Sequence, residues 1–279
     1  MYYHQIVAGV IVHPSKREVF PLGMEPVYKE SKSSKNDCEI NATKRFLKDI
    51  KKDYPNEAFI IVTDALYANV PYILGLKKLD MEYIIGAKPG KNKNLFEWIE
   101  GIELSEYKVC KEGITYHYKF INGIPISCNL EKPEVNFFEC TLEDKKGKKR
   151  FTWITSLEIN LENIEDLVKA GRARWKIENE TFNTLKNQGY QFEHNFGHGY
   201  KNLCHVFGNL MLLAFLIDQI QQHGCPFFQA ALKKIKYRKY LWERIRILFY
   251  SFCINSWKDI FLAIAKDYIR PNLALYNTS

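Results

Sequence analysis

The sequence lacks the marks of secretion and of membrane insertion. Met1 runs straight into the strand-like YYHQIVAGVIV, with no basic start and no cleavage site, so we expect no signal peptide. The most apolar run, Val206 to Ile217, is too short to span a bilayer. Seven cysteines occur without any CxxC pair, and this odd number favours a reducing cytoplasm over a disulfide scaffold. We therefore expect a cytoplasmic protein with reduced cysteines and no membrane partner.

The chain has enough apolar material for a large core and an excess of positive charge. Its 279 residues are 46% hydrophobic, which is sufficient for one large domain or one domain with an insertion. The formal net charge is +8, and the basic residues are clustered rather than evenly spread. Clustered positive charge favours a nucleic acid partner over a membrane surface.

The first 90 residues alternate between strand and helix patterns, which predicts an α/β fold. The expected elements are a hairpin of strands at 3–13 and 18–22, a helix capped by Asn36 or Asp37 and ending at Lys52, a strand at 58–62, a helix ending at Leu79 and a strand at 81–87. The run at 58–62 is continuously apolar and rich in β-branched residues, as in a central strand that is covered on both faces. The last three elements form a βαβ unit.

Asp64 follows the strand at 58–62, where open α/β sheets place their ligand sites. The alternative is that Asp64 caps the helix that follows, since Asp is a good capping residue. The sequence of this segment favours neither interpretation over the other.

Residues 95–157 change to alternating patterns separated by NG and KKGK turns, which predicts a small antiparallel insertion. The expected strands are 115–120, 124–128, 136–142 and 150–155. One hairpin tip concentrates positive charge in Lys145, Lys146, Lys148, Lys149 and Arg150. This tip is either a solvated hairpin or a phosphate contact, and both interpretations stay open.

The stretch from Leu161 to Lys186 predicts one long helix with a carboxylate on its apolar face. At 100° per residue, one inward arc collects the apolar side chains of Leu167, Leu185, Ile164, Phe182, Trp175 and Val168. Glu178 falls within the same arc. A buried carboxylate must be protonated, paired or bound to a metal, because burying it bare costs several kcal/mol. Arg174, one turn earlier, is the candidate partner for a purely structural ion pair.

The remaining residues are predicted to be helical. The segment 202–222 is apolar nearly all round and should be buried, whereas 233–246 is strongly basic and contains aromatic residues. The basic segment is either a solvated helix or a grip on a nucleic acid backbone. His194, His198, Cys204 and His205 lie close together, but their spacing fits no zinc pattern, so we do not favour a metal site there.

Four segments together resemble the bacterial DDE transposases of the insertion sequence four family, whose signature helix carries Tyr, Arg, Glu and Lys. The segments are RARWKIENETFNTLK at 172–186, SKNDCE at 34–39, VTDALYANVPYI at 62–73 and QGYQFEHNFGHG at 188–199. On this resemblance, Arg174, Glu178 and Lys186 take the signature Arg, Glu and Lys. Gly171 stands where the signature has Tyr, and the interval from Glu178 to Lys186 is one residue longer than usual.

The resemblance implies a ribonuclease H-like core with a β-rich insertion before the catalytic Glu and a helical C-terminal region. The corresponding boundaries are residues 1–94 and 158–200 for the two parts of the core, 95–157 for the insertion and 201–279 for the helical region. It also implies that Asp64 and Glu178 are catalytic and bind two Mg²⁺ or Mn²⁺ ions, because such sites hold their metals with carboxylates.

DNA is the partner that the resemblance implies, with two copies of the chain pairing on it. Arg174, Lys186 and the basic residues 145–150 and 233–246 are then expected to contact phosphates. The two carboxylates should converge on one pocket although they are far apart in the sequence.

The first catalytic Asp of such transposases has no convincing equivalent in this sequence. It should lie on the opening strand of the sheet, but Glu18, Glu25 and Glu30 fall in or near turns and Asp37 is expected to cap a helix. The sequence therefore predicts an amino-terminally truncated transposase that keeps DNA affinity but catalyses little strand transfer. The alternatives are a DNA-binding remnant or domesticated protein without catalysis, and a nuclease of the same fold.

Overall fold

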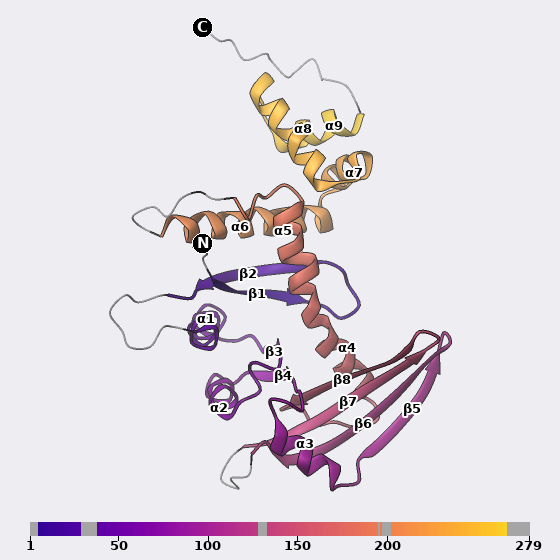
Figure 1. The fold of residues 1–279 in the computed structure, drawn as a ribbon. Helices are drawn as coiled ribbons and strands as arrows, with labels where there is room; N and C mark the ends of the chain where they lie inside the picture. The colour runs from indigo at the N-terminus through magenta and orange to yellow at the C-terminus, as the bar shows by residue number, and fades with distance from the viewer. Residues whose placement is uncertain (1–4, 29–37, 128–132, 195, 197–201, 267–279) are drawn as a thin grey trace. The chain divides into compact units, whose positions relative to one another are not determined.

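A computed structural model describes residues 5–28, 38–127, 133–194, 196 and 202–266 (Figure 1). The chain divides into two compact units. The first unit consists of Glu25–Trp175 with Met1–Val7 and Val12–Lys16, and the second of Lys176–Ser279 with Ala8–Ile11 and Arg17–Met24. The boundary between them along the chain falls within a helical stretch, between Trp175 and Lys176.

The first unit is built on a six-stranded mixed sheet with the strand order β3-β4-β8-β7-β6-β5. Only the neighbours β3 and β4 of this sheet pair in parallel. The strands are β3 (Ile60–Thr63), β4 (Glu82–Gly86), β5 (Ser105–Lys111), β6 (Ile114–Pro125), β7 (Glu134–Asp144) and β8 (Gly147–Thr155). The helices of this unit are α1 (Glu39–Asp53), α2 (Val70–Lys78), α3 (Lys93–Glu100) and α4 (Ile164–Arg172). This combination confirms the predicted α/β class.

Strand β3 lies at the edge of this sheet, so the prediction of a central strand is wrong. Within the described chain it pairs with β4 alone, and Ile60 is 52% exposed. A short β-branched run indicates a strand, but its composition does not say how many neighbours the strand has. The position of Asp64 immediately after β3 is as predicted.

The antiparallel strands β5 to β8 continue the sheet of β3 and β4, because β8 pairs with β4. The predicted strands at 115–120 and 124–128 are one strand, β6, with a register shift between Ile121 and Ile124. The NG dipeptide therefore forms a bulge rather than a hairpin turn, and Gly123 supplies the positive φ of +71° that the bulge requires. Cys128 lies outside the described residues, and β5 and α3 were not predicted.

The predicted N-terminal hairpin is confirmed as a two-stranded sheet of β1 (Ile6–Val12) and β2 (Val19–Pro26). The predicted helix that follows is α1, which begins after Cys38 rather than after a capping Asn or Asp. The candidate caps Asn36 and Asp37 lie outside the described residues. Leu47 and Ile50 of this helix are buried.

The stretch 164–187 is helical but changes its winding three times. It consists of α4, a 3₁₀ turn at Ala173–Trp175, a π-helical turn at Ile177–Phe182 and α5 (Asn183–Asn187). These changes break the 100° progression on which the predicted inward arc depended. Ile164, Leu167, Val168 and Leu185 are buried as predicted, but Glu178 is exposed and Trp175 is 43% exposed. The prediction of a buried carboxylate at Glu178 is therefore wrong.

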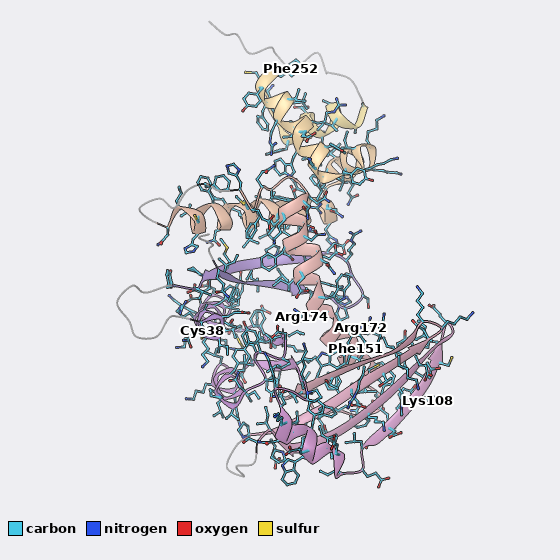
Figure 2. All side chains as sticks on the ribbon, in the orientation of Figure 1. Cys38, Lys108, Phe151, Arg172, Arg174 and Phe252 are labelled. Carbon is cyan, nitrogen blue, oxygen red and sulfur yellow. The ribbon has the colours of Figure 1, made fainter. Side chains whose placement is uncertain are left out.

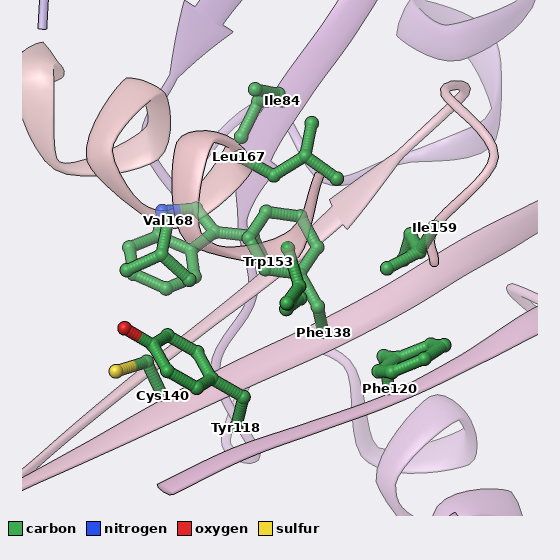
Figure 3. Close-up of a cluster of buried hydrophobic side chains, with 10 residues drawn as sticks. Ile84, Tyr118, Phe120, Phe138, Cys140, Trp153, Ile159, Leu167 and Val168 are labelled. Atoms are coloured by element: carbon green, nitrogen blue, oxygen red, sulfur yellow. The ribbon is translucent and has the colours of Figure 1, made fainter. Parts of the chain in front are cut away.

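The core of the first unit lies between the sheet and α4 (Figure 3). Phe138 of β7 and Trp153 of β8 stack with their ring centroids 5.2 Å apart. Ile84 of β4 joins them from the strands, and Leu167 and Val168 join them from α4. Each fully buried apolar side chain of this kind contributes roughly 1.5–3 kcal/mol. The helix that leads towards Arg174 is thus held on the sheet by its apolar face.

Gly171 permits the close packing of α4 on Trp153. A Cβ atom at position 171 would lie 2.7 Å from Cε2 and Nε1 of the Trp153 indole ring. Trp153 is itself buried, with 6% of its surface exposed, so the ring has little room to move. The indole ring therefore accounts for a glycine at the position where the transposase signature has Tyr.

The second unit is mainly helical. Its helices are α6 (Leu203–Gly224), α7 (Pro226–Ile235), α8 (Arg238–Ser251) and α9 (Trp257–Lys266), in addition to the end of the stretch 164–187. The last three helices share a core that includes Phe228, Leu241, Ile245 and Phe261.

Helix α6 is less buried than its composition predicted. Five of its apolar side chains are 47–55% exposed, and they recur at intervals of four and three residues: Val206, Leu210, Leu213, Ile217 and Ile220. The helix also extends beyond the apolar run seen in the sequence. Its 22 residues have a window of mean hydropathy 1.7, and by length and composition alone it could cross a membrane. One such helix is weak evidence for a membrane span, because core helices of soluble proteins pass the same test.

The basic segment 233–246 is not one helix, which corrects the prediction. Its first part ends α7, and the chain turns at Lys236, where φ is +71°, before α8 begins. Arg238 is directed inward and donates a hydrogen bond to the hydroxyl of Tyr190 (3.3 Å), with Nη1 3.8 Å from Oδ2 of Asp218. Burial raises the pKa of Asp218, although the Tyr190 hydroxyl and Arg238 both favour its charged form. Arg238 therefore has a structural role in the second unit.

We predict that Gly171→Ala destabilises the protein. The new methyl group gains helix propensity but forces the Trp153 ring out of its packing, for a net loss of about 1–2 kcal/mol. A loss of this size lowers the melting temperature by roughly 2–4 °C per kcal/mol. Calorimetry or circular dichroism measures the shift.

Gly75→Ala is the matched control, because Gly75 lies in α2 and a Cβ atom there would have nothing within 4 Å. This variant should be neutral or slightly stabilising. Equal melting temperatures for the two variants would contradict the packing argument.

Candidate functional site

Asp64 lies exposed in the turn between β3 and α2. Its Oδ1 accepts a hydrogen bond from the backbone N–H of Leu66 (2.8 Å), and its carbonyl oxygen accepts one from the N–H of Tyr67 (3.2 Å). The cap of α2 is instead Asn69, whose Oδ1 accepts the N–H of Tyr72 (3.1 Å). Asp64 therefore does not cap α2, and its carboxylate faces solvent at the carboxyl end of β3.

The turn that carries Asp64 is attached to α1 through the buried side chain of Tyr67. The Tyr67 hydroxyl lies 2.9 Å from Oε1 of Glu39 and 2.9 Å from Oγ1 of Thr43. Burial raises the pKa of Tyr67 well above its ordinary value, so this phenol stays protonated and can donate to Glu39. These contacts fix the end of the turn, and with it the direction in which Asp64 leaves the sheet.

Gly86 brings the end of β4 close to the same turn. A Cβ atom at Gly86 would lie 3.3 Å from the backbone nitrogen of Ala65, closer than most side chains approach a neighbour. The glycine at position 86 therefore lets the backbone of β4 pack closely against the Asp64–Ala65 peptide, where a Cβ atom would make a tight contact.

Arg174 lies in the 3₁₀ turn that packs against β3, the strand that ends at Asp64. The preceding Arg172 places its guanidinium 5.2 Å from the ring centroid of Phe151 on β8 (Figure 2). The structure thus brings the segment of the signature Arg beside the strand of the candidate Asp within the first unit.

Glu178 lies exposed in the π-helical turn of the second unit. Lys186, on α5, forms an ion pair of 2.8 Å with Glu193, and both side chains are well exposed. Because Asp64 and Glu178 belong to different units, their convergence on one metal site stays a prediction.

The basic hairpin between β7 and β8 has Lys145 and Lys146 at its tip. Lys148 pairs with Glu143 (3.2 Å), and Nε of Arg150 donates to Oε2 of Glu139 (3.0 Å). Lys145, Lys146 and Lys149 are exposed and have no ion pair to a described residue. The cluster therefore contains two kinds of cation, and the three lysines are the better candidates for phosphate contacts.

Within the described residues, no group of three or more His, Cys, Asp or Glu side chains could hold a metal ion. His198 lies outside the described residues, and the ring of His194 packs edge-on against Phe196 at 4.6 Å. None of the six cysteines that the structure describes is in a disulfide bond.

Sequence reasoning did not identify Tyr67, Asn69 and Gly86 as supports of this turn. Asn69 carries a recognisable signal, because an Asn followed by Val-Pro is a common helix start. Tyr67 and Gly86 have no such signal, since each acts through a neighbour that is distant in the sequence.

A model of the transposase DDE domain matches residues 20–239, well over half of the chain. The chain belongs to the transposase DDE domain family. DDE transposases generally use divalent metal ions. No curated protein matches the sequence.

One similar solved structure is that of a piggyBac transposase in a synaptic complex with hairpin DNA. It aligns with 95% of this chain at 9% identity and a TM-score of 0.41, and this chain spans 57% of the length of that transposase chain.

Most of the π-helical turn lies between Glu178 and Lys186, in an interval that is longer than in the signature that the sequence resembles. A π-turn closes its hydrogen bonds between residues i and i+5, so it holds one residue more than an α-turn. Ile177–Phe182 lies almost entirely within the interval that is one residue longer than in the signature. Single π-turns inside helices also occur frequently at functional sites.

We predict that replacing Lys145, Lys146 and Lys149 with Gln reduces the salt dependence of DNA binding. Each lost phosphate contact should lower the slope of log K against log salt by about 0.9. Fluorescence anisotropy with a labelled duplex at several salt concentrations measures this slope. Lys148→Gln is the comparison, because Lys148 is already paired with Glu143 and should change the slope less. An unchanged slope for the triple variant would exclude these lysines from the DNA contact.

Proposed function

We propose that this DDE domain cleaves DNA and transfers strands at a carboxylate site that contains Asp64 and Glu178. The observation that supports this most directly is the exposed carboxylate of Asp64, held in a fixed turn at the carboxyl end of β3. Family membership supplies the reaction class, and the position of Asp64 is the one that α/β sheets use for ligand binding.

The donor atoms fit a divalent metal ion such as Mg²⁺ or Mn²⁺. Asp64 and Glu178 are both exposed carboxylates, and hard cations prefer such oxygen ligands. One oxygen of Asp64 accepts the N–H of Leu66, which orients the carboxylate and leaves lone pairs on both oxygens. When bound, the ions would supply activation of the attacking hydroxyl and stabilisation of the leaving oxygen.

The side chains of this domain would bind and orient the DNA. Arg174 follows α4 in the turn that packs on β3, where a guanidinium can hold a phosphate beside Asp64. Lys186 and the lysines of the β7–β8 hairpin would hold phosphates farther along the strand. The network of Tyr67, Glu39 and Thr43 would keep the Asp64 turn in place while DNA binds.

We also propose that the sheet and its helices form a ribonuclease H-like core with the predicted boundaries at 94, 157 and 200, and that two copies pair on DNA. The cytoplasmic location stays a prediction.

Asp64→Asn should abolish metal-dependent DNA cleavage without unfolding the protein. The Asn side chain can still accept the N–H of Leu66, so the turn is kept and only the charge is lost. Loss of several kcal/mol of metal binding corresponds to a rate at least about a hundredfold lower. The assay measures Mg²⁺-dependent cleavage and joining of a DNA substrate that carries terminal repeats.

Asp80→Asn is the control for this experiment. Asp80 is exposed after α2 and has a positive φ of 53°, which Asn tolerates. It should cleave at the wild-type rate. Cleavage by Asp64→Asn at the same measurable rate as the wild-type chain and Asp80→Asn would exclude Asp64 from the site.

The carboxyl groups of Asp64 and Glu178 should lie within about 8 Å of each other when metal is bound, because a two-metal site cannot bridge a larger gap. A crystal structure with Mn²⁺, located by its anomalous scattering, measures this separation. A Mn²⁺ ion bound elsewhere, or a larger separation, would contradict the pairing of these two residues.

The second candidate function is DNA binding without strand transfer. The number of candidate carboxylates favours this function. The chemistry of the family calls for three catalytic carboxylates, and this sequence offers convincing candidates for two. In that case the wild-type chain would bind DNA with a steep salt dependence, and Mg²⁺ or Mn²⁺ would produce no joined product. Robust joining by residues 1–279 alone would exclude this candidate.

A further inference from the structure

A buried polar cluster in the second unit joins three segments that are far apart in the sequence. The hydroxyl of Tyr190, in the segment after α5, donates a hydrogen bond to Oδ2 of Asp218 on α6. Arg238, at the start of α8, donates to the same hydroxyl (3.3 Å), and its Nη2 donates to Oε1 of Gln222 on α6. The side chains of Arg238 and Asp218 are only 13% and 7% exposed. No step of the proposed reaction uses this cluster.

The cluster fixes the position of Tyr190 more closely than apolar packing alone would. Hydrogen bonds are directional, and a buried polar network whose members are all paired favours a single arrangement of its segments. The Tyr190 ring also packs edge-on against Phe215 of α6, with 5.5 Å between the ring centroids, and against Trp242 of α8 at 6.1 Å. Tyr190 is therefore held by α6 and α8 through both its ring and its hydroxyl.

The backbone just before Tyr190 lies against α8. Gly189 has a positive φ of 99°, which residues with side chains rarely adopt. A Cβ atom at Gly189 would lie 3.4 Å from Cα of Lys239 and 3.5 Å from Cδ1 of Trp242. Nη2 of Arg246 donates to the carbonyl oxygen of Gly189 (3.4 Å). The segment that contains Tyr190 is thus attached to α8 by backbone contacts as well.

The residues after Tyr190 turn back onto the end of the helical stretch that carries Lys186. The N–H of Phe192 donates to the carbonyl oxygen of Leu185 (3.3 Å), and Glu193 forms the 2.8 Å ion pair with Lys186. Helix α5, which contains Lys186, also packs against α6 (Figure 1). The anchored segment is therefore in direct contact with a residue that we expect to bind phosphate.

The same segment contacts the π-helical turn that carries Glu178. The ring of Phe192 lies 6.0 Å from the ring of Phe182, centroid to centroid, and Phe182 is the last residue of that turn. Helix α5 is only five residues long and ends the helical stretch. Because helix ends fray, the direction of this last turn depends on the segment that packs on it.

The cluster is separate from the apolar core that α7, α8 and α9 share. That core includes Phe228, Leu241 and Phe261, whereas Tyr190 faces α6 and the start of α8. Loss of the Tyr190 hydroxyl would therefore leave the core of these three helices in place and would weaken the connection between them and α5.

We propose that Tyr190 is a positioning residue for Lys186, through which α6 and α8 set the direction of the last turn of the helical stretch 164–187. The role of Lys186 as a phosphate contact rests on the proposed function, whereas the connection itself rests on the contacts of Tyr190. Asp218 and Arg238 act on Lys186 through Tyr190 and do not themselves touch DNA in this arrangement. The C-terminal helices thus contribute to DNA binding by orienting Lys186.

Tyr190→Phe tests this role because it removes the hydroxyl and keeps the ring. Lys186 would then take up more directions, so binding of a fluorescein-labelled duplex, measured by anisotropy, should weaken about threefold or more. Tyr250→Phe is the matched control, because Tyr250 also lies on a helix of this unit but is 87% exposed. The control should bind DNA as the wild-type chain does.

A double-mutant cycle separates positioning from a purely structural effect. If Tyr190 acts through Lys186, Tyr190→Phe should have no further effect on DNA binding in a chain that already carries Lys186→Gln. In a chain that carries Lys149→Gln, which removes a cation of the β7–β8 hairpin, the full effect should remain. A residue that only stabilises the fold would lower the melting temperature and have the same effect on binding in both chains. That result would overturn the proposal.

Hydrogen exchange tests the connection without DNA. In the wild-type chain, the amide of Phe192 should exchange in the same cooperative unit as the amides of α6 around Asp218. Tyr190→Phe should speed exchange at Phe192 by roughly threefold to tenfold, the factor that the loss of one hydrogen bond produces, and Tyr250→Phe should leave it unchanged. A Phe192 amide that exchanges well before α6 in the wild-type chain would overturn the proposal, even if Tyr190→Phe does not fold.

The two measurements separate this proposal from the proposed function. Faster exchange at Phe192 in Tyr190→Phe, together with a wild-type chain that does not bind DNA, would support the connection and contradict the proposed function. DNA binding that depends on Lys186 but is unchanged by Tyr190→Phe would support the DNA partner and overturn the positioning role of Tyr190.

Discussion

The first unit depends on the double pairing of one short strand. β4 forms hydrogen bonds in parallel with β3 on one side and antiparallel with β8 on the other. Its Ile84 and Ile85 are fully buried, so the strand is fixed by its two neighbours and by the burial of its apolar side chains. Through β3 it sets the position of Asp64, and through β8 it sets the position of Trp153. Any shift of β4 by one residue would turn its buried side chains to the opposite faces.

The positions of Asp64 and Trp153, which both depend on the pairing of β4, also affect the segments of the candidate site. On one side, Gly86 lets the end of β4 approach the peptide that follows Asp64. On the other, Trp153 and Gly171 set how closely α4 lies on the sheet, and α4 leads into the turn of Arg174. The chain belongs to the transposase DDE domain family. The packing explains how the segments of the candidate residues Asp64 and Arg174 are held in the first unit.

In the second unit, Arg238 has a structural role although it belongs to the basic segment 233–246, whose sequence suggests a binding surface. Asp218 and Arg238 come from α6 and α8, and both are largely buried beside the hydroxyl of Tyr190. Removing one partner of such a pair leaves the other charge buried and is usually costly, so the pair is more important for the fold than for DNA contact. By contrast, the exposed apolar stripe of α6 contains no charge and has the spacing of a helix–helix contact.

The sequence by itself determined most of the helices and strands and the chemical type of the candidate residues. Alternating patterns identified the hairpin, the βαβ unit and most of the antiparallel strands, and the position of Asp64 after its strand was correct. Local patterns carry this information because strand and helix periods are set by the nearest residues. Only the tertiary structure decided that β3 is an edge strand, that Asn122–Gly123 is a bulge and that Glu178 is exposed. Each of these depends on contacts or on a change of helical winding that a fixed period of 100° per residue cannot represent.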